Sequence, residues 1–154
     1  MKSSDDDTVR RAAVGDAAAI GRLLYNFNCE YEEPTPDPSV LAVRLTELLE
    51  AGETLVLLAE TGPEGLAVLR FRPAIWSSGL ECYLAELYVA PASRGRGLGR
   101  ALMEAALREA RERGADTVDL GTSETDVVAR GLYESLGFTN REGGGGGGRG
   151  SQSP

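Results

Sequence analysis

The chain has no histidine among its 154 residues. This absence removes the commonest general base, the Ser-His and Cys-His nucleophile pairs and most zinc sites. Proton transfer must therefore use Glu, Asp, Tyr, Cys, Lys or water, and we expect no bound metal. Cysteine is scarce as well, because only Cys29 and Cys82 are present. A domain of this length needs no disulfide to be stable, so we expect both to be free, mostly buried thiols.

Long apolar runs and an excess of basic residues are also missing. No stretch approaches the ~20 apolar residues of a membrane span. Residues 1–7 are polar and carry three consecutive aspartates, unlike a secretory signal. The net charge of −8 argues against a nucleic-acid partner and leaves room for a cationic substrate, although acidity can equally serve solubility alone. We expect a cytoplasmic protein without membrane or nucleic-acid partners.

The composition is that of one globular domain with two polar ends. The hydrophobic fraction is 42% and the charged fraction 26%. We assign residues 1–7 to a disordered tail and residues 8–142 to the folded domain. Residues 143–148 are all glycine, which has no side chain to bury and the most backbone entropy to lose. Residues 143–154 are therefore predicted to form a second disordered tail.

The order of apolar patterns predicts a mixed, three-layer α/β fold. Residues 8–13 can form a short edge strand before a helix with Asp16 as its N-cap. A proline-rich acidic loop over 29–38 leads to a second helix that begins at Pro38 and ends at Gly52. Further elements follow in the order strand 54–60, strand 65–72, strand 81–89, helix 98–113, strand 117–120 and helix 127–136.

The most informative segment lies between the strand over 81–89 and the helix over 98–113. Glycines at alternate positions allow a tight turn and let an anion approach the backbone, and the following helix aims its unpaired amides at the same point. Arginines add positive charge in an otherwise acidic chain. The alternative is a plain strand-helix connection with solvated arginines. The residues are Arg94, Gly95, Arg96, Gly97, Leu98, Gly99 and Arg100.

This turn resembles a known coenzyme signature. The pattern Arg94-x-x-Gly97-x-Gly99 is similar to the [RQ]-x-x-G-x-[GA] motif of the GNAT superfamily of N-acetyltransferases. Downstream, the stretch from Asp126 through Tyr133 to Phe138 resembles the family pattern N-x-x-A-x-x-L-Y-x-x-x-G-F. The resemblance implies a GNAT-like three-layer mixed sheet flanked by helices. It also implies direct transfer of an acetyl group from acetyl-CoA to a primary amine of a small molecule or peptide.

The resemblance assigns roles to individual residues. Coenzyme contacts fall on Leu87, Tyr88, Val89, the turn from Arg94 to Arg100, Asp126 and Tyr133. Tyr133 would protonate the departing thiolate as general acid, the alternative being a tyrosine that packs the last helix. Glu86 is the candidate base, the alternative being a partly buried structural carboxylate. A backbone N–H near Val89 would stabilise negative charge on the thioester oxygen.

The acceptor side is less clearly indicated. The acidic loop and nearby aromatic residues would suit a cationic amine such as a polyamine, an aminoglycoside or a lysine side chain, whereas a solvated loop explains the same residues. The candidate contacts are Tyr25, Glu30, Tyr31, Glu33 and Trp76.

Two departures from the family pattern stand out. Asp126 replaces the usual Asn, and glycines follow Phe138 where the family continues with its last strand. The last strand is therefore expected to be missing, unless a second copy of the chain supplies it in a homodimer. A non-catalytic acyl-CoA sensor is the alternative function, and a phosphate-binding regulatory domain is a third.

Overall fold

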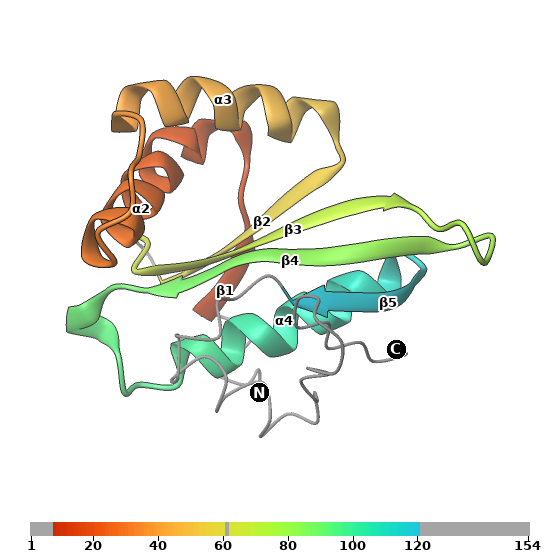
Figure 1. Cartoon of the computed structure of the whole chain (residues 1–154). Helices are drawn as coiled ribbons and strands as arrows, with labels where there is room; N and C mark the ends of the chain where they lie inside the picture. Colours follow the sequence, from red (N-terminus) through yellow and green to blue (C-terminus); the bar gives the residue numbers. More distant parts are fainter. Residues whose placement is uncertain (1–7, 61, 121–154) are drawn as a thin grey trace.

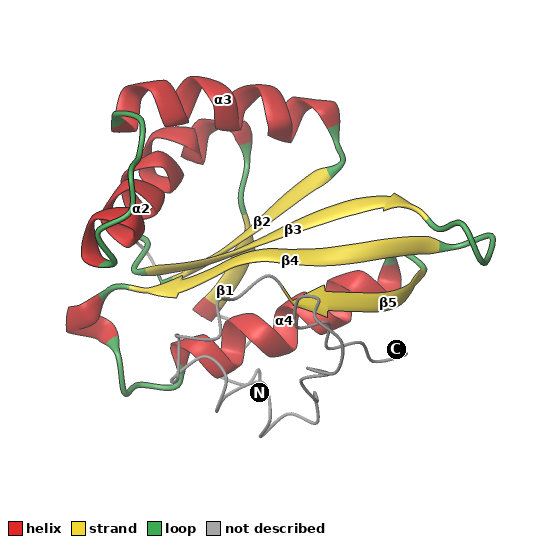
Figure 2. Cartoon of the chain, viewed as in Figure 1, coloured by secondary structure: helices red, strands yellow, loops and turns green. Residues whose placement is uncertain are grey.

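A computed structural model describes residues 8–60 and 62–120, which build a five-stranded mixed sheet. The strands lie in chain order, antiparallel from β1 to β4, and β5 is parallel to β4 (Figure 2). Their bounds are β1 Val9–Arg11, β2 Thr54–Ala59, β3 Gly65–Pro73, β4 Leu80–Val89 and β5 Ala115–Leu120.

The helices form two layers, one on each face of the sheet. Helices α2 (Ala17–Glu30) and α3 (Pro38–Ala51) cover one face, and α4 (Leu98–Glu112) covers the other (Figure 1). Two short 3₁₀ helices, η1 (Val14–Asp16) and η2 (Pro91–Ser93), precede α2 and follow β4. The expected three-layer mixed sheet is therefore confirmed. The predicted helix 127–136, the two tails and the missing strand lie outside the described residues.

The first two helices begin and end near the expected residues. Helix α3 starts at Pro38 and stops at Gly52, whose φ of 86° is left-handed. Asp16 occupies the N-cap of α2, but its carboxylate accepts hydrogen bonds from the Arg10 guanidinium (3.0 Å) and the Ala13 N–H (2.8 Å). The Arg10 hydrogen bond holds the Asp16 pKa below its ordinary value. Asp16 thus ties the edge strand to the start of α2.

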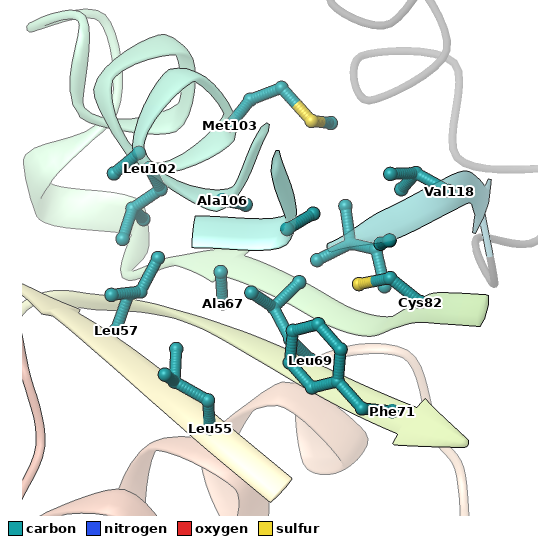
Figure 3. Close-up of a cluster of buried hydrophobic side chains, with 14 of the residues drawn as sticks. Leu55, Leu57, Ala67, Leu69, Phe71, Cys82, Leu102, Met103, Ala106 and Val118 are labelled. Atoms are coloured by element: carbon teal, nitrogen blue, oxygen red, sulfur yellow. The ribbon is translucent and has the colours of Figure 1, made fainter. Parts of the chain in front are cut away.

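Each face of the sheet buries its own apolar cluster. The larger cluster joins the sheet to α4, where Leu69, Leu102 and Met103 are fully buried (Figure 3). Cys82 lies in this cluster at 1% exposure. The smaller cluster joins the other face to α2 and α3. The two thiols are free, as expected, but the prediction that both are mostly buried is wrong for Cys29, which is exposed at the end of α2.

A β-bulge interrupts β4 at Ala85. Val68 of β3 pairs with Glu86, and the next β3 residue pairs with Leu84, so Ala85 has no partner of its own. Because side chains alternate along a strand, one extra residue exchanges the two faces from that point on. Apolar side chains packed against the α4 cluster accordingly shift from even to odd positions, in the order Leu80, Cys82, Leu84, Leu87 and Val89.

Helices α2 and α3 cross at Gly21, and this contact gives a stability test. A Cβ added at Gly21 would lie 2.8 Å from the Pro38 carbonyl oxygen and 3.1 Å from the Ala42 nitrogen. Gly21→Ala should therefore lower the free energy of unfolding by about 1–3 kcal/mol in urea denaturation. Gly15→Ala is the control, because nothing lies within 4 Å of a Cβ there. Equal stability of the two variants would contradict the close helix crossing.

Candidate active site

The second half of β4 presents an open backbone edge. Among the described residues, β5 pairs with β4 only from Leu80 to Leu84. The Ala90 N–H donates to the Glu64 carbonyl at 2.8 Å, which fixes the alternation of the antiparallel ladder. By that alternation the N–H and C=O groups of Leu87 and Val89 point away from β3. They face the side on which no described strand pairs.

The glycine-rich turn lies at the end of this open edge. Gly95 and Gly97 have φ values of 84° and 82°, and no atom of the described residues lies within 4 Å of a Cβ built on either. Gly97 is also the N-cap of α4, so the amides of Leu98 and Gly99 in the first helical turn lack intrahelical acceptors. The Leu98 side chain itself is buried in the core. Open space, free amides and the positive end of a helix dipole therefore coincide at this turn.

Contacts to the β2–β3 turn hold the glycine-rich turn in place. Ser93 is buried, with 2% exposure, and its hydroxyl donates a hydrogen bond to the Glu64 carboxylate. Arg96 forms an ion pair with Glu60. These glutamates and Ser93 were not among the predicted site residues, because the contacts span about 30 residues of sequence and no local pattern marks them.

Carboxylates already neutralise the arginines of the turn. Arg94 pairs with Glu30 at 2.8 Å and donates from Nε to the Val89 carbonyl at 2.9 Å. Arg94 also keeps the pKa of Glu30 below its ordinary value, mainly through their hydrogen bond. Arg100 lies 3.9 Å from Glu104. The predicted positive charge is present but is balanced within the chain.

The bulge places Glu86 on the face covered by α2 and α3. Its partner across the ladder is Val68, a member of the cluster on that face. Burial raises the pKa of the Glu86 carboxyl, and no described residue donates a hydrogen bond to it or pairs with it. A carboxyl in this state takes up a proton more readily than an exposed glutamate does.

Tyr88 lies on the same face and links it to α2. Its ring stacks on Phe27 with centroids 4.6 Å apart, and its hydroxyl donates to Glu30 at 2.9 Å. Burial is the main reason that the pKa of Tyr88 rises to about 12, so the hydroxyl stays protonated at neutral pH. The side chain of Tyr88 is thus engaged within the protein, and by the same alternation its backbone groups face Leu66 of β3, so the open side of β4 is formed by its neighbours Leu87 and Val89.

The predicted acceptor residues fall into two separate places. Tyr25, Glu30, Tyr31 and Glu33 lie at the end of α2 and in the loop that follows. Within this group, the carboxylate of Glu30 is occupied by its contacts with β4 and the turn. Trp76 is 92% exposed at the tip of the β3–β4 hairpin, at the opposite end of β4 (Figure 1). The structure therefore does not bring Trp76 together with the others.

Two predicted residues, Asp126 and Tyr133, lie outside the described residues. Among residues 8–60 and 62–120, no group of Cys, Asp and Glu is arranged to hold a metal ion. None of the helices in that part of the chain is long and apolar enough to cross a membrane.

Comparison with known proteins decides the family. Residues 21–138 match the profile of the Acetyltransferase (GNAT) family. The chain belongs to the GNAT family of acetyltransferases. It is 31% identical over 132 residues to the uncharacterized N-acetyltransferase YhfO of Bacillus subtilis, a match that covers 84% of this chain and 88% of that protein. A 66-residue stretch is 47% identical to mycothiol acetyltransferase of Thermobispora bispora but spans only 22% of that longer protein.

Solved structures of acetyltransferases share the fold. A crystal structure assigned as an acetyltransferase from Arthrobacter sp. FB24 has a TM-score of 0.82 and 42% identity, with 96% of this chain and 95% of that chain covered. An acetyltransferase from Clostridium acetobutylicum, crystallised with acetyl-CoA, has a TM-score of 0.74 over 90% of this chain and 93% of that chain. At 21% identity, the second likeness concerns the fold alone.

The burial of Glu86 gives a pH-dependent stability test. The pKa of Glu86 is higher in the folded state than in the unfolded state. Ionisation of Glu86 therefore lowers the free energy of unfolding as pH rises from the unfolded pKa through the folded pKa. Glu86→Gln should therefore raise the unfolding midpoint at pH 7, and the gain should vanish below about pH 4, where both states are protonated. Glu50→Gln, at an exposed position of α3, is the control. A Glu86→Gln variant that is destabilised at both pH values would contradict the assigned burial.

Proposed function

We propose that the protein transfers the acetyl group of acetyl-CoA to a primary amine of a small molecule or peptide. The observation that carries this proposal is the left-handed glycine turn, with open space before Gly95 and Gly97, at the junction of the open β4 edge and the N-terminus of α4. Family membership and the acetyl-CoA held by the Clostridium protein of the same fold support it.

The residues of the turn suit a pyrophosphate. Backbone amides at the start of α4 can donate to phosphate oxygens, and a glycine at position 97 keeps that approach free of a side chain. Exposed ion pairs contribute only about 0–1 kcal/mol each, so Arg94 and Arg96 can exchange their glutamate partners for phosphate at little cost. The pantetheine arm would then follow the backbone groups of Leu87 and Val89 that point away from β3, of which the Val89 carbonyl accepts from Arg94 in the free protein. Acetyl-CoA supplies the acetyl group as an activated thioester.

The chain's own residues supply the remaining chemistry. An alkylamine with pKa ~10.4 is almost entirely protonated at pH 7, so a base must take its proton. In our proposal Glu86 accepts that proton, directly or through water, and its raised pKa suits the task. The N–H of Leu87 or Val89 stabilises the developing oxyanion. By the family resemblance, Tyr133 protonates the leaving thiolate, and Asp126 contributes to the coenzyme site.

Direct transfer is favoured over a route through an acylated Cys82. Burial raises the pKa of the Cys82 thiol to about 12, so almost no nucleophilic thiolate exists there at neutral pH. Acetylation of a cysteine during turnover, detected by mass spectrometry, would contradict direct transfer.

A pair of glycine substitutions tests the coenzyme site. Gly97 is the N-cap of α4, and Gly114 follows the C-terminal end of the same helix. Their φ values are 82° and 83°, and no atom of the described residues lies within 4 Å of a Cβ built on either. Gly97→Trp and Gly114→Trp should therefore carry a similar strain of about 1–3 kcal/mol. Only Gly97→Trp should weaken CoA binding in calorimetry, by at least about tenfold (~1.4 kcal/mol). Equal affinities of the two variants would remove the glycine turn from the coenzyme site.

Release of free thiol from acetyl-CoA separates catalysis from mere binding. The wild-type chain, incubated with acetyl-CoA and a panel of primary amines, should release CoA in an amine-dependent manner. Binding of CoA without release for any amine would favour the non-catalytic sensor. Stabilisation by free phosphate equal to that by CoA would favour the regulatory phosphate-binding domain.

Tyr133→Phe tests the general acid. Loss of a positioned acid should lower kcat by about 10²-fold or more and leave the KM for acetyl-CoA nearly unchanged. The measurement is steady-state thiol release across pH. An unchanged kcat would show that the Tyr133 hydroxyl plays no part in proton transfer.

A further inference from the structure

A hollow lies on the sheet face that carries Glu86, beyond the two covering helices. Figure 1 shows α2 and α3 over the half of this face nearer Val89, while the end of β3 and the start of β4 run past them. The hollow has a volume of about 270 Å³ and is bounded by charged residues and Tyr83, together with Phe71 and Cys82 of the α4 cluster. Those on which the inference depends are Glu53, Arg70, Arg72, Glu81, Tyr83 and Asp119.

The strand register explains why these side chains meet. Arg70 of β3 pairs with Tyr83 of β4, which pairs with Asp119 of β5, so the three form one row across the sheet. Arg72 and Glu81 form the next row on the same face. Directly paired residues project to the same face of a sheet, and alternate residues share that face. Both rows therefore project into the hollow rather than into the α4 core.

Arg70 differs from the other arginines around it. Arg72 is held by Glu81 at 2.5 Å, and the arginines of the glycine-rich turn are each paired with a glutamate. No described residue accepts a hydrogen bond from the Arg70 guanidinium or forms an ion pair with it. An arginine whose planar fork is not already used is suited to bind a carboxylate with two parallel hydrogen bonds.

The hollow and Glu86 lie along the same strand. Tyr83 and Glu86 are three residues apart, at most about 10 Å at ~3.3 Å per residue, and the bulge at Ala85 puts both on one face. A volume of about 270 Å³ is just below the usual range of ligand pockets, which is about 300–1,000 Å³. The hollow therefore fits a compact molecule rather than a protein segment.

We propose that this hollow binds the acceptor, and that the acceptor is a free amino acid whose carboxylate is held by Arg70. The inference rests on the acetyltransferase function proposed above and names its substrate class. The negative charges of Glu53 and Asp119 attract the cationic amino group of an amino acid. They therefore favour a ligand with both charges over a simple anion. The acceptor nitrogen forms a bond to the acetyl carbon and the carbon–sulfur bond breaks. One proton of the ammonium passes by way of Glu86 to solvent, another is lost as the amide forms, and CoA leaves as the thiol.

Matched pairs of amines test the inference. Each amino acid of a panel is compared with its decarboxylated counterpart, such as lysine with cadaverine or tyrosine with tyramine, in the thiol-release assay. The kcat/KM of the preferred amino acid should exceed that of its counterpart by at least about tenfold, as expected for a charge-assisted pair. Arg70→Gln should abolish that preference and leave CoA affinity unchanged.

Arg22→Gln is the matched control, because Arg22 is an exposed arginine of α2 that lies outside the hollow and has no described partner. It should keep the full preference. Equal rates for amino acids and their decarboxylated counterparts would overturn the inference, as would a loss in Arg70→Gln that is the same for both members of each pair.

A binding measurement keeps this inference separate from the acetyltransferase proposal. Calorimetric titration of the CoA-loaded protein with each amino acid of the panel should show binding that weakens about tenfold or more in Arg70→Gln. If no amine supports thiol release but an amino acid still binds through Arg70, the acetyltransferase proposal fails. The assignment of the hollow as an amino-acid site is then still supported. If no amino acid binds, the hollow is not the acceptor site, whatever the assay gives.

Discussion

The single unpaired residue at Ala85 is the constraint on which the site depends. Without it, Glu86 and Tyr88 would continue the alternation of Cys82 and Leu84 and would point into the α4 core. With it, the acid and the tyrosine lie on the face covered by α2 and α3, the same face as the Arg70 side chain. Within the described residues, which end at Leu120, the β4–β5 ladder runs from Leu80 to Leu84, just before the bulge.

Glutamates balance the positive charge around the glycine-rich turn. Glu30, Glu60 and Glu64 fix Arg94, Arg96 and the 3₁₀ helix η2 in place, so the charge around the turn is balanced. Within residues 8–60 and 62–120, the backbone amides at the start of α4 lack intrahelical acceptors. Because exposed ion pairs contribute little, a ligand at this turn gains most from those amides and the helix dipole.

Local patterns predicted most of the fold, whereas contacts distant in sequence did not emerge from them. Gly52 ended α3 as expected, since only the residues nearby decide a left-handed cap. Glu30 was expected to face a substrate, yet it pairs with Arg94, which lies 64 residues away along the chain. The bulge did leave a trace in the sequence: the apolar positions of β4 change parity between Leu84 and Leu87. When this change of parity is taken into account, the alternation predicts that Glu86 lies on the face opposite the α4 cluster.

Amide hydrogen exchange on adding CoA tests the central claim most directly. If the coenzyme lies on the turn and along the open edge of β4, the amides of Gly97, Leu98, Gly99, Leu87 and Val89 should exchange more slowly when CoA is bound. Amides of the β1–β2 edge, on the far side of the sheet, should be unaffected. Protection confined to other parts of the chain, with these five amides unchanged, would contradict the account.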